Sequence, residues 1–186
     1  MPDNTNQERP KILLHACCAV CMAYPIEMLI EENYDPVVFF FNPNIYPIEE
    51  YNRRKNELIK YCEAKKYNYI IEDYAPNGWY EHIKNFENEP EKGLRCNKCF
   101  EYRLNFTAKK AKELGIKYFT TTLTVSPHKI SKNVFAAGLL VQNMYGIEFL
   151  QKDFKKQNGF LKTMQLAKEN DFYRQQYCGC EYSIRN

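Results

Sequence analysis

The sequence predicts an α/β fold in a single domain, with a parallel sheet and helices on both of its faces. Five short apolar segments rich in β-branched and aromatic residues recur along the chain, and stretches with helical periodicity separate them. Strands that alternate with helices form βαβ units, in which the strands run parallel. A chain of 186 residues with 45% hydrophobic residues is also long enough and apolar enough to bury one core.

The predicted elements follow one another in a regular order. We expect strands at residues 11–16, 37–42, 67–74, 118–123 and 147–154, and helices at 23–33, 48–66, 98–114, 131–145 and 159–173. Residues 1–10 are predicted to form a polar tail, and 11–186 the domain. Prolines and glycines interrupt the alternation at 75–93. There we expect an insertion that holds a short helix and forms a mobile loop.

Charge and hydropathy exclude some classes of protein. The net charge of +3 is too small to indicate a nucleic-acid partner by itself. The polar start of the chain does not fit a secretory signal, and no apolar run approaches the roughly 20 residues that cross a bilayer. We therefore expect a cytoplasmic protein with no membrane partner.

Seven of the eight cysteines fall into three groups. The groups are Cys17, Cys18 and Cys21; Cys96 and Cys99; and Cys178 and Cys180. In a reducing compartment, such cysteines favour metal binding or redox chemistry over a disulfide scaffold. The first group follows the first predicted strand, at the edge where open α/β sheets bind ligands, and the chain has no glycine-rich phosphate loop. Cys62 lies among apolar residues and is expected to be a small buried side chain.

The spacing of the first two groups indicates a metal centre. Cys96 and Cys99 are three residues apart at a predicted helix start, so their thiols share one face and form half of a four-ligand site. Cys17 and Cys18 are candidates for the other half. Adjacent cysteines are poorly placed to chelate one zinc, whereas a cluster binds them at separate irons, which favours iron over the alternative of structural zinc. Cys21 is a cluster ligand, a ligand to a second iron, or a packed residue.

The third group is predicted to cycle between dithiol and disulfide. Gly179 separates Cys178 from Cys180 and lets the backbone bend enough to close a small ring. Such a bridge is strained and therefore easily reduced, which suits redox cycling better than a structural role. Metal ligation and the absence of any chemical role are the alternatives.

Other polar residues are weaker candidates. His15 precedes the cysteine pair and is either a proton donor that tunes thiolates or a buried structural residue. Asp73 and Asp153 fall near predicted strand ends, as iron ligands, proton donors or solvated side chains. The segment TTTLTVSPHKISKN supplies hydroxyl and cationic donors for phosphate or ribose, or else ends a strand and caps a helix. A basic patch for RNA is expected from Arg53, Arg54, Arg103, Lys129, Lys132, Lys155, Lys156 and Arg174.

Several blocks of the sequence together resemble the QueH-type epoxyqueuosine reductases. The blocks are LLHACCAVC, FFFNPNIYPIEEYNRR, GLRCNKCFEYRL, TTTLTVSPHKISKN and DFKKQNGFLKTMQLAKENDFYRQQYCGCEYS, which span nearly the whole chain. The sequence departs from the family pattern at Val20, where proline is usual, and at His128, where tyrosine is common. Neither departure removes a thiol.

The resemblance implies a fold, cofactors and a reaction. The fold is a HUP-like, Rossmann-type α/β domain. By position, Cys17, Cys18, Cys96 and Cys99 would bind a [4Fe-4S] cluster, and Cys178 and Cys180 would form a redox-active disulfide. An additional iron ion is also implied, with ligands sought among Cys21 and the aspartates. The substrate would be tRNA carrying epoxyqueuosine in the anticodon loop, reduced by two electrons from a separate electron donor.

Three other classes remain as alternatives. A zinc-stabilised RNA-binding protein would explain the cysteines and basic residues without catalysis. A HUP-type tRNA-thiolating enzyme also places cysteines at a sheet edge, although the missing glycine-rich loop argues against ATP chemistry. A thiol–disulfide oxidoreductase that uses CNKC or CGC has no need of adjacent cysteines.

Overall fold

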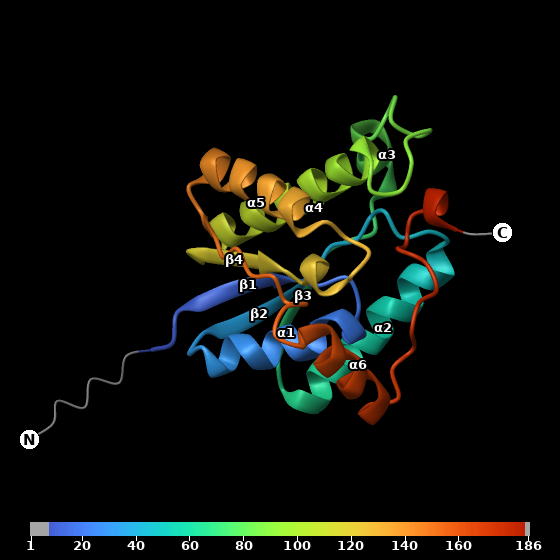
Figure 1. The fold of residues 1–186 in the computed structure, drawn as a ribbon. Helices are drawn as coiled ribbons and strands as arrows, with labels where there is room; N and C mark the ends of the chain where they lie inside the picture. Colours follow the sequence, from blue (N-terminus) through green and yellow to red (C-terminus); the bar gives the residue numbers. More distant parts are fainter. Residues whose placement is uncertain (1–7, 185–186) are drawn as a thin grey trace, which may run out of the picture.

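The computed structural model describes residues 8–184 and contains a five-stranded parallel sheet in the order β3-β2-β1-β4-β5 (Figure 1). The strands are β1 (Lys11–His15), β2 (Asp35–Phe40), β3 (Asn68–Ile71), β4 (Tyr118–Thr121) and β5 (Glu148–Phe149). Four are shorter than the segments that predicted them, whereas β2 has the predicted length of six residues and begins two residues earlier. The predicted α/β fold is confirmed, and the predicted tail at 1–10 lies mostly outside the described residues.

Successive side chains of the central strand β1 pack alternately into two separate cores. Ile12 and Leu14 of β1 belong to one buried cluster, whereas Leu13 belongs to the other. This alternation is the two-residue period of a strand whose two faces are both covered. An unbroken apolar run such as ILL is therefore what a central parallel strand requires.

Helices cover both faces of the sheet (Figure 1). On one side lie α1 (Ala19–Glu31), α2 (Ile48–Lys65) and α6 (Gly159–Glu169), and on the other lie α4 (Leu94–Glu113) and α5 (Ser131–Tyr145). Shorter helical segments are α3 (Pro76–His82) and the 3-10 turns η1 (Thr122–Val125) and η2 (Glu181–Ser183). Among the described helices, none combines the length and apolar character that a membrane span needs.

Three helix boundaries differ by four residues from those predicted. The first helix begins at Ala19 rather than at residue 23, because the Cys18 sulfur caps it by accepting from the Cys21 backbone N–H. Helix α4 begins at Leu94 rather than at residue 98, so Cys96 and Cys99 are both helical. The last helix ends at Glu169 rather than at residue 173. Chain direction changes there through Asp171, whose φ is 51°.

The predicted insertion does contain a short helix. Trp79 and Ile83 of this segment are 1% and 0% exposed, and they pack with Cys99 and Cys180 in one buried cluster. A side chain at Gly78 would come within 2.3 Å of the Tyr102 hydroxyl, so glycine allows α3 to lie close against α4. The helical part of the insertion is therefore anchored over the CxxC pair.

The strand order places a crevice beside the first group of cysteines. The chain leaves β1 toward β2 on one side, while β4 leads to β5 on the other. The crevice at such a switch point, beyond the carboxyl ends of the strands, is the usual ligand site of an open α/β sheet. Cys17 follows β1 and Thr122 follows β4, with 3.8 Å between the Cys17 Sγ and the Thr122 hydroxyl. The fold therefore brings these sulfurs to the crevice.

Candidate functional site

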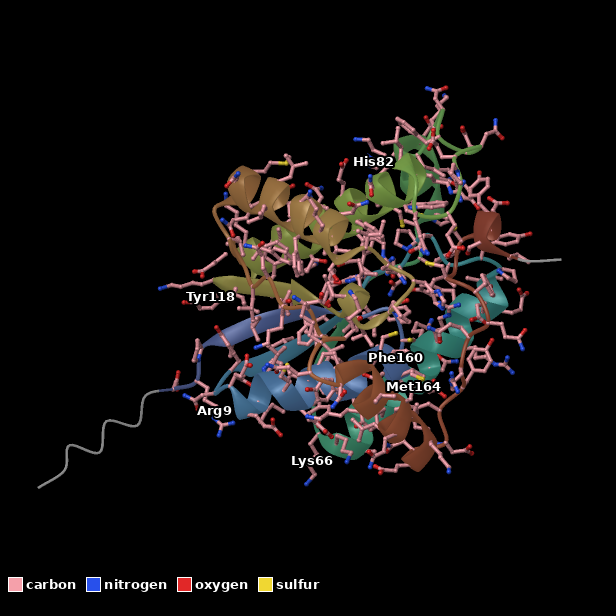
Figure 2. The ribbon with its side chains drawn as sticks, viewed as in Figure 1. Arg9, Lys66, His82, Tyr118, Phe160 and Met164 are labelled. Atoms are coloured by element: carbon pink, nitrogen blue, oxygen red, sulfur yellow. The ribbon has the colours of Figure 1, made fainter. Side chains whose placement is uncertain are left out.

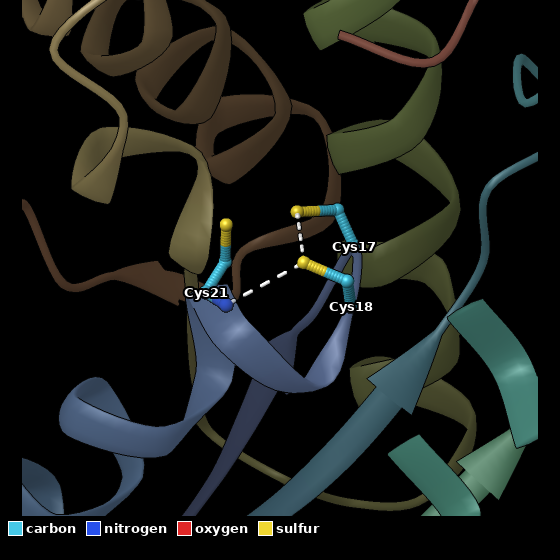
Figure 3. Close-up of side chains that lie close together, drawn as sticks. All are labelled: Cys17, Cys18 and Cys21. Atoms are coloured by element: carbon cyan, nitrogen blue, oxygen red, sulfur yellow. Dashed lines mark hydrogen bonds between the residues drawn. The ribbon is translucent and has the colours of Figure 1, made fainter. Parts of the chain in front are cut away.

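Cys17, Cys18 and Cys21 form a compact triad of sulfur atoms at the start of α1 (Figure 3). The three Sγ atoms lie within 4.8 Å of one another, and the Cys17 and Cys18 sulfurs are 3.8 Å apart. All three residues are buried, with exposures of 7%, 1% and 9%. Cys18 ends the extended segment and Cys21 lies in the first helical turn, so the turn between them folds the sulfurs together. This arrangement can hold a metal ion.

The triad stabilises a negative charge on one of its sulfurs. Hydrogen bonds from the thiols of Cys18 and Cys21 hold the pKa of Cys17 well below its ordinary value, against the effect of burial. The same bonding raises the pKa of Cys18 to about 12 and also raises the pKa of Cys21. Gln175 adds a hydrogen bond to the Cys18 sulfur at 3.4 Å. One thiolate shared by three buried sulfurs is a favourable site for a cation.

The other four cysteines of the predicted site line one of two adjoining cavities, which we call the second cavity. Cys96 and Cys99 reach it from α4, and Cys178 and Cys180 reach it from the C-terminal segment. Burial raises the pKa of Cys96 and Cys99 and raises the pKa of Cys180 to about 12. These three groups are therefore neutral thiols until a metal or another positive charge favours their anionic form.

Cys178 joins the two groups of sulfurs. It lines the cavity of Cys96, Cys99 and Cys180, and it also lines a neighbouring cavity of about 250 Å³ with Cys17 and Cys21. The structure therefore gathers all three predicted cysteine groups around two adjoining cavities. Within the described chain, the sulfurs that already lie within ligand distance of one another are the triad. The set of Cys17, Cys18, Cys96 and Cys99 stays a prediction.

The second cavity is rich in N–H donors that lack a partner. Trp79 Nε1, Arg95 Nε and Arg103 Nε are buried without a hydrogen bond, and all three residues line this cavity. Unpaired buried donors cost free energy, so their clustering indicates an anionic occupant. A metal cluster held by thiolates carries negative charge on its sulfurs. The residues present therefore fit such a group.

A buried arginine holds the C-terminal cysteine loop in place. Arg54 is 1% exposed, pairs with Glu50 at 2.7 Å, and donates to the carbonyls of Tyr177 and Cys178 at 3.4 and 3.1 Å. Gly179 has a φ of 137°, and a side chain there would meet the Arg54 guanidinium at 3.2 Å. The glycine thus permits both the turn and the close approach of the arginine.

Replacing Arg54 by methionine is expected to lower the free energy of unfolding by about 3–5 kcal/mol, because Glu50 would keep its buried charge without a partner. Urea denaturation checks this. Arg53→Met is the matched control on the same helix: Arg53 is exposed and contacts the Tyr173 ring at 4.2 Å, an interaction worth about 1 kcal/mol or less. Equal losses in both variants would contradict a special role for the buried arginine.

His15 is a buried structural residue rather than a proton donor. It is fully buried, its Nδ1 accepts from the Thr121 hydroxyl at 2.8 Å, and its Nε2 donates to the Phe41 carbonyl at 3.2 Å. Burial, helped by the charge of Arg103, lowers its pKa to about 3. The imidazole is therefore neutral at physiological pH and braces β1 and β4.

The two aspartates are not brought to the site. Asp73 is exposed, and Asp153 pairs with Lys155 at 3.0 Å. In the part of the chain that the structure describes, neither aspartate is among the residues that line the two cavities. Of the residues named for a second iron, the structure thus brings Cys21 alone to the sulfur-lined crevice.

The expected basic patch is only partly on the surface. Arg54 and Arg103 are 1% and 2% exposed, so placing them on an RNA-binding surface was wrong, and both instead contact the site from within. Lys129 and Arg174 line the larger cavity, together with His128. Cys62 is fully buried, as predicted.

Sequence patterns missed Trp79 and Arg95 as part of the site. Arg95 donates to the carbonyls of Glu87 and Glu89 and so orders the loop that follows α3. Arg95 stands directly beside Cys96, and Trp79 is the single tryptophan of the chain, lying in the one segment that breaks the βα alternation. These two features of the sequence could have identified Arg95 and Trp79 as residues of the site.

A parallel sheet with cysteine sulfurs at its switch point and two adjoining sulfur-lined cavities defines a cysteine-rich protein of the open, doubly wound α/β class. Within that class the family is clear from sequence. The family model for epoxyqueuosine reductase QueH matches residues 12–186, and the chain belongs to the QueH family.

Curated relatives cover most of the chain. An epoxyqueuosine reductase QueH from Streptococcus pyogenes is 43% identical over 183 residues, covering 95% of this chain and 71% of the relative. The relative from Acinetobacter baylyi is 38% identical over 187 residues, covering 100% and 84% of the two chains. The relative from Thermotoga maritima is 32% identical over 176 residues, covering 93% and 90%.

A solved structure supports the fold. The U34-tRNA thiolase NcsA from Methanococcus maripaludis, determined with its [4Fe-4S] cluster, superposes with a TM-score of 0.58 at 12% sequence identity. The match covers 96% of this chain and 63% of the thiolase. At this identity the likeness concerns the fold alone, and it confirms the predicted HUP-like architecture.

Proposed function

We propose that this protein is an oxidoreductase that converts epoxyqueuosine to queuosine at the wobble position of tRNA. The reaction adds two electrons and two protons, removes the epoxide oxygen as water, and leaves a cyclopentene ring. One observation carries the proposal: in a chain of the QueH family, Cys178 lies where the cavity of Cys96, Cys99 and Cys180 adjoins the cavity of Cys17 and Cys21. Redox-active sulfur and candidate metal ligands thus face one space that is open to a substrate.

We infer that Cys17, Cys18, Cys96 and Cys99 hold a [4Fe-4S] cluster. Three of the four, Cys17, Cys18 and Cys99, are buried. Further support comes from the unpartnered donors of Trp79, Arg95 and Arg103. Such a cluster supplies electrons one at a time, which no side chain of the protein does. Cys21 faces the larger cavity, and we propose it as a ligand to an additional iron, a Lewis acid for the epoxide oxygen.

We propose that Cys178 and Cys180 form the redox-active pair that receives electrons from a separate donor. Both are free thiols in the structure. The Cys180 sulfur lies 3.6 Å from the Ser183 hydroxyl, and the Gly179 N–H donates to that hydroxyl at 3.3 Å. Ser183 thus fixes the turn between the two thiols, and Cys178 lines both cavities.

The larger cavity suits a base that is turned out of the anticodon loop. Phe160 and Met164 project from α6 to line it (Figure 2). These side chains offer an apolar wall for a modified base, since proteins read single-stranded RNA by stacking unpaired bases. Lys129 and Arg174 line the same cavity. Burial acts to lower the pKa of Lys129, but nearby cysteine sulfurs raise it overall, so the ammonium remains available to bind an anionic oxygen.

The test begins with protein purified without oxygen. We expect about four irons with matching acid-labile sulfide per chain, visible absorption that bleaches with dithionite, and conversion of epoxyqueuosine in tRNA detected by mass spectrometry of nucleosides. Iron in excess of sulfide would support the additional iron. Zinc without sulfide and no conversion would favour the zinc-stabilised RNA-binding protein. ATP-dependent sulfur transfer to tRNA would favour the thiolating enzyme.

A further inference from the structure

Trp79 presents a buried N–H group with no acceptor. The indole is 1% exposed, yet its Nε1 makes no hydrogen bond within the described part of the chain. A tryptophan that serves packing alone normally directs this N–H to a carbonyl, a hydroxyl or solvent. Leaving it unpaired in a protein interior destabilises the fold, because the group has lost its hydrogen bonds to water. The buried N–H therefore requires an acceptor that is present only in another state of the site.

The sulfur of Cys99 is the candidate acceptor. Trp79 and Cys99 belong to one buried cluster and line one cavity. The Trp79 N–H lies within reach of the Cys99 sulfur as a side-chain donor, although the contact falls short of a hydrogen bond. A neutral thiol accepts hydrogen bonds weakly, but a thiolate accepts them strongly. A metal-bound thiolate at Cys99 would therefore supply the missing acceptor.

Aromatic packing restricts the orientation of the Trp79 indole. Its ring meets Tyr80 at a centroid distance of 5.1 Å and an interplanar angle of 68°. Tyr182, which follows the cysteine loop, lies 6.4 Å away. Contacts with two aromatic rings leave the indole little freedom to turn its N–H elsewhere. The insertion at 75–93 therefore carries a donor to the CxxC pair from outside the α/β core.

We propose that the Trp79 N–H donates a hydrogen bond to the metal-bound sulfur of Cys99 and thereby raises the reduction potential of the cluster. This inference rests on the proposed function. A hydrogen bond to a ligand sulfur withdraws negative charge and so favours the reduced, more negative cluster. Arg103, whose guanidinium lies 4.0 Å from the same sulfur, is a second donor. Trp79 acts through Cys99 and is therefore a positioning residue.

The test compares Trp79→Phe with wild-type protein after both are loaded with iron and sulfide. Phenylalanine keeps a packed ring but removes the N–H. We expect an unchanged iron content and a tenfold shift of the reduction equilibrium toward the oxidised cluster, which corresponds to a potential lower by about 59 mV for one electron. Tyr80→Phe is the matched control, because it alters a neighbouring ring on the same helix, and its potential should equal that of the wild type.

A second measurement does not depend on how the variant folds. Since the chain has a single tryptophan, labelling with ¹⁵N-tryptophan marks only Trp79. Pulsed electron paramagnetic resonance of the reduced wild-type cluster is expected to show coupling to this nitrogen. Absence of coupling, or an unchanged potential in iron-replete Trp79→Phe, would overturn the inference. Wild-type protein that binds no iron and sulfide would instead overturn the proposed function itself.

Discussion

Cys96→Ala protein is expected to lose both its iron–sulfur absorption and its turnover on tRNA that contains epoxyqueuosine. Cys96 lies in the first turn of α4, and its sulfur accepts the Lys92 backbone N–H at 3.3 Å. A loop amide thus already supports negative charge on this sulfur. Removing one of four ligands leaves an iron open to solvent and oxygen. Iron, sulfide and nucleoside analysis of anaerobically prepared protein measures the result.

The control for this prediction is Cys62→Ala. Cys62 is fully buried, donates to the Met22 sulfur at 4.0 Å and belongs to the core cluster beneath α2. The control removes a thiol of similar size from the same protein, so it should lose some stability and keep full iron and activity. Full iron content and normal turnover in Cys96→Ala would remove Cys96 from the ligand set.

The sheet and the gathering of the cysteines were predictable for the same reason. An apolar segment such as that of β1 is stable as a parallel strand with both faces covered. The carboxyl ends of parallel strands meet at one edge of the sheet. Cys17 and Cys18 follow such a strand directly. Their location at the crevice therefore depends on local sequence and strand direction, both of which the sequence contains.

The start of α1 was not predictable from the usual signals. Sequence rules look for serine, threonine, aspartate or asparagine as the residue that caps a helix. Here the Cys18 sulfur takes that role. The capping contact also brings Cys21 close to Cys17 and Cys18, so the unusual cap and the compact triad have one cause.

Buried charge was the other feature that sequence could not locate. Arg54 and Arg103 look like surface residues, because arginine is seldom fully buried without a partner. Arg54 pairs with Glu50 one helical turn away, but its other partner, the Cys178 carbonyl, is distant in the chain, and so is Asn42, the partner of Arg103. The path of the C-terminal segment depends on these contacts. For that reason the placement of Cys178 between two cavities emerges only from the folded structure.

Cys178→Ser is expected to retain the cluster and to stop turnover supported by a dithiol reductant. Cys178 is predicted to be a redox partner rather than a cluster ligand, so the visible spectrum and iron content should remain those of the wild type. Without its sulfur, no disulfide with Cys180 can form, and two electrons cannot enter by this route. The measurement is the rate of queuosine formation with dithiol as the sole electron source.

Cys180→Ser separates the alternatives that Cys178→Ser leaves open. If the two thiols act as a pair, both variants lose dithiol-dependent turnover to the same extent and both keep their iron. Cys180 is more deeply buried than Cys178 and lines only one of the two cavities, so a function of Cys178 alone would leave Cys180→Ser active. Loss of iron from Cys178→Ser, with iron retained in Cys180→Ser, would make Cys178 a metal ligand that bridges the two groups of sulfurs.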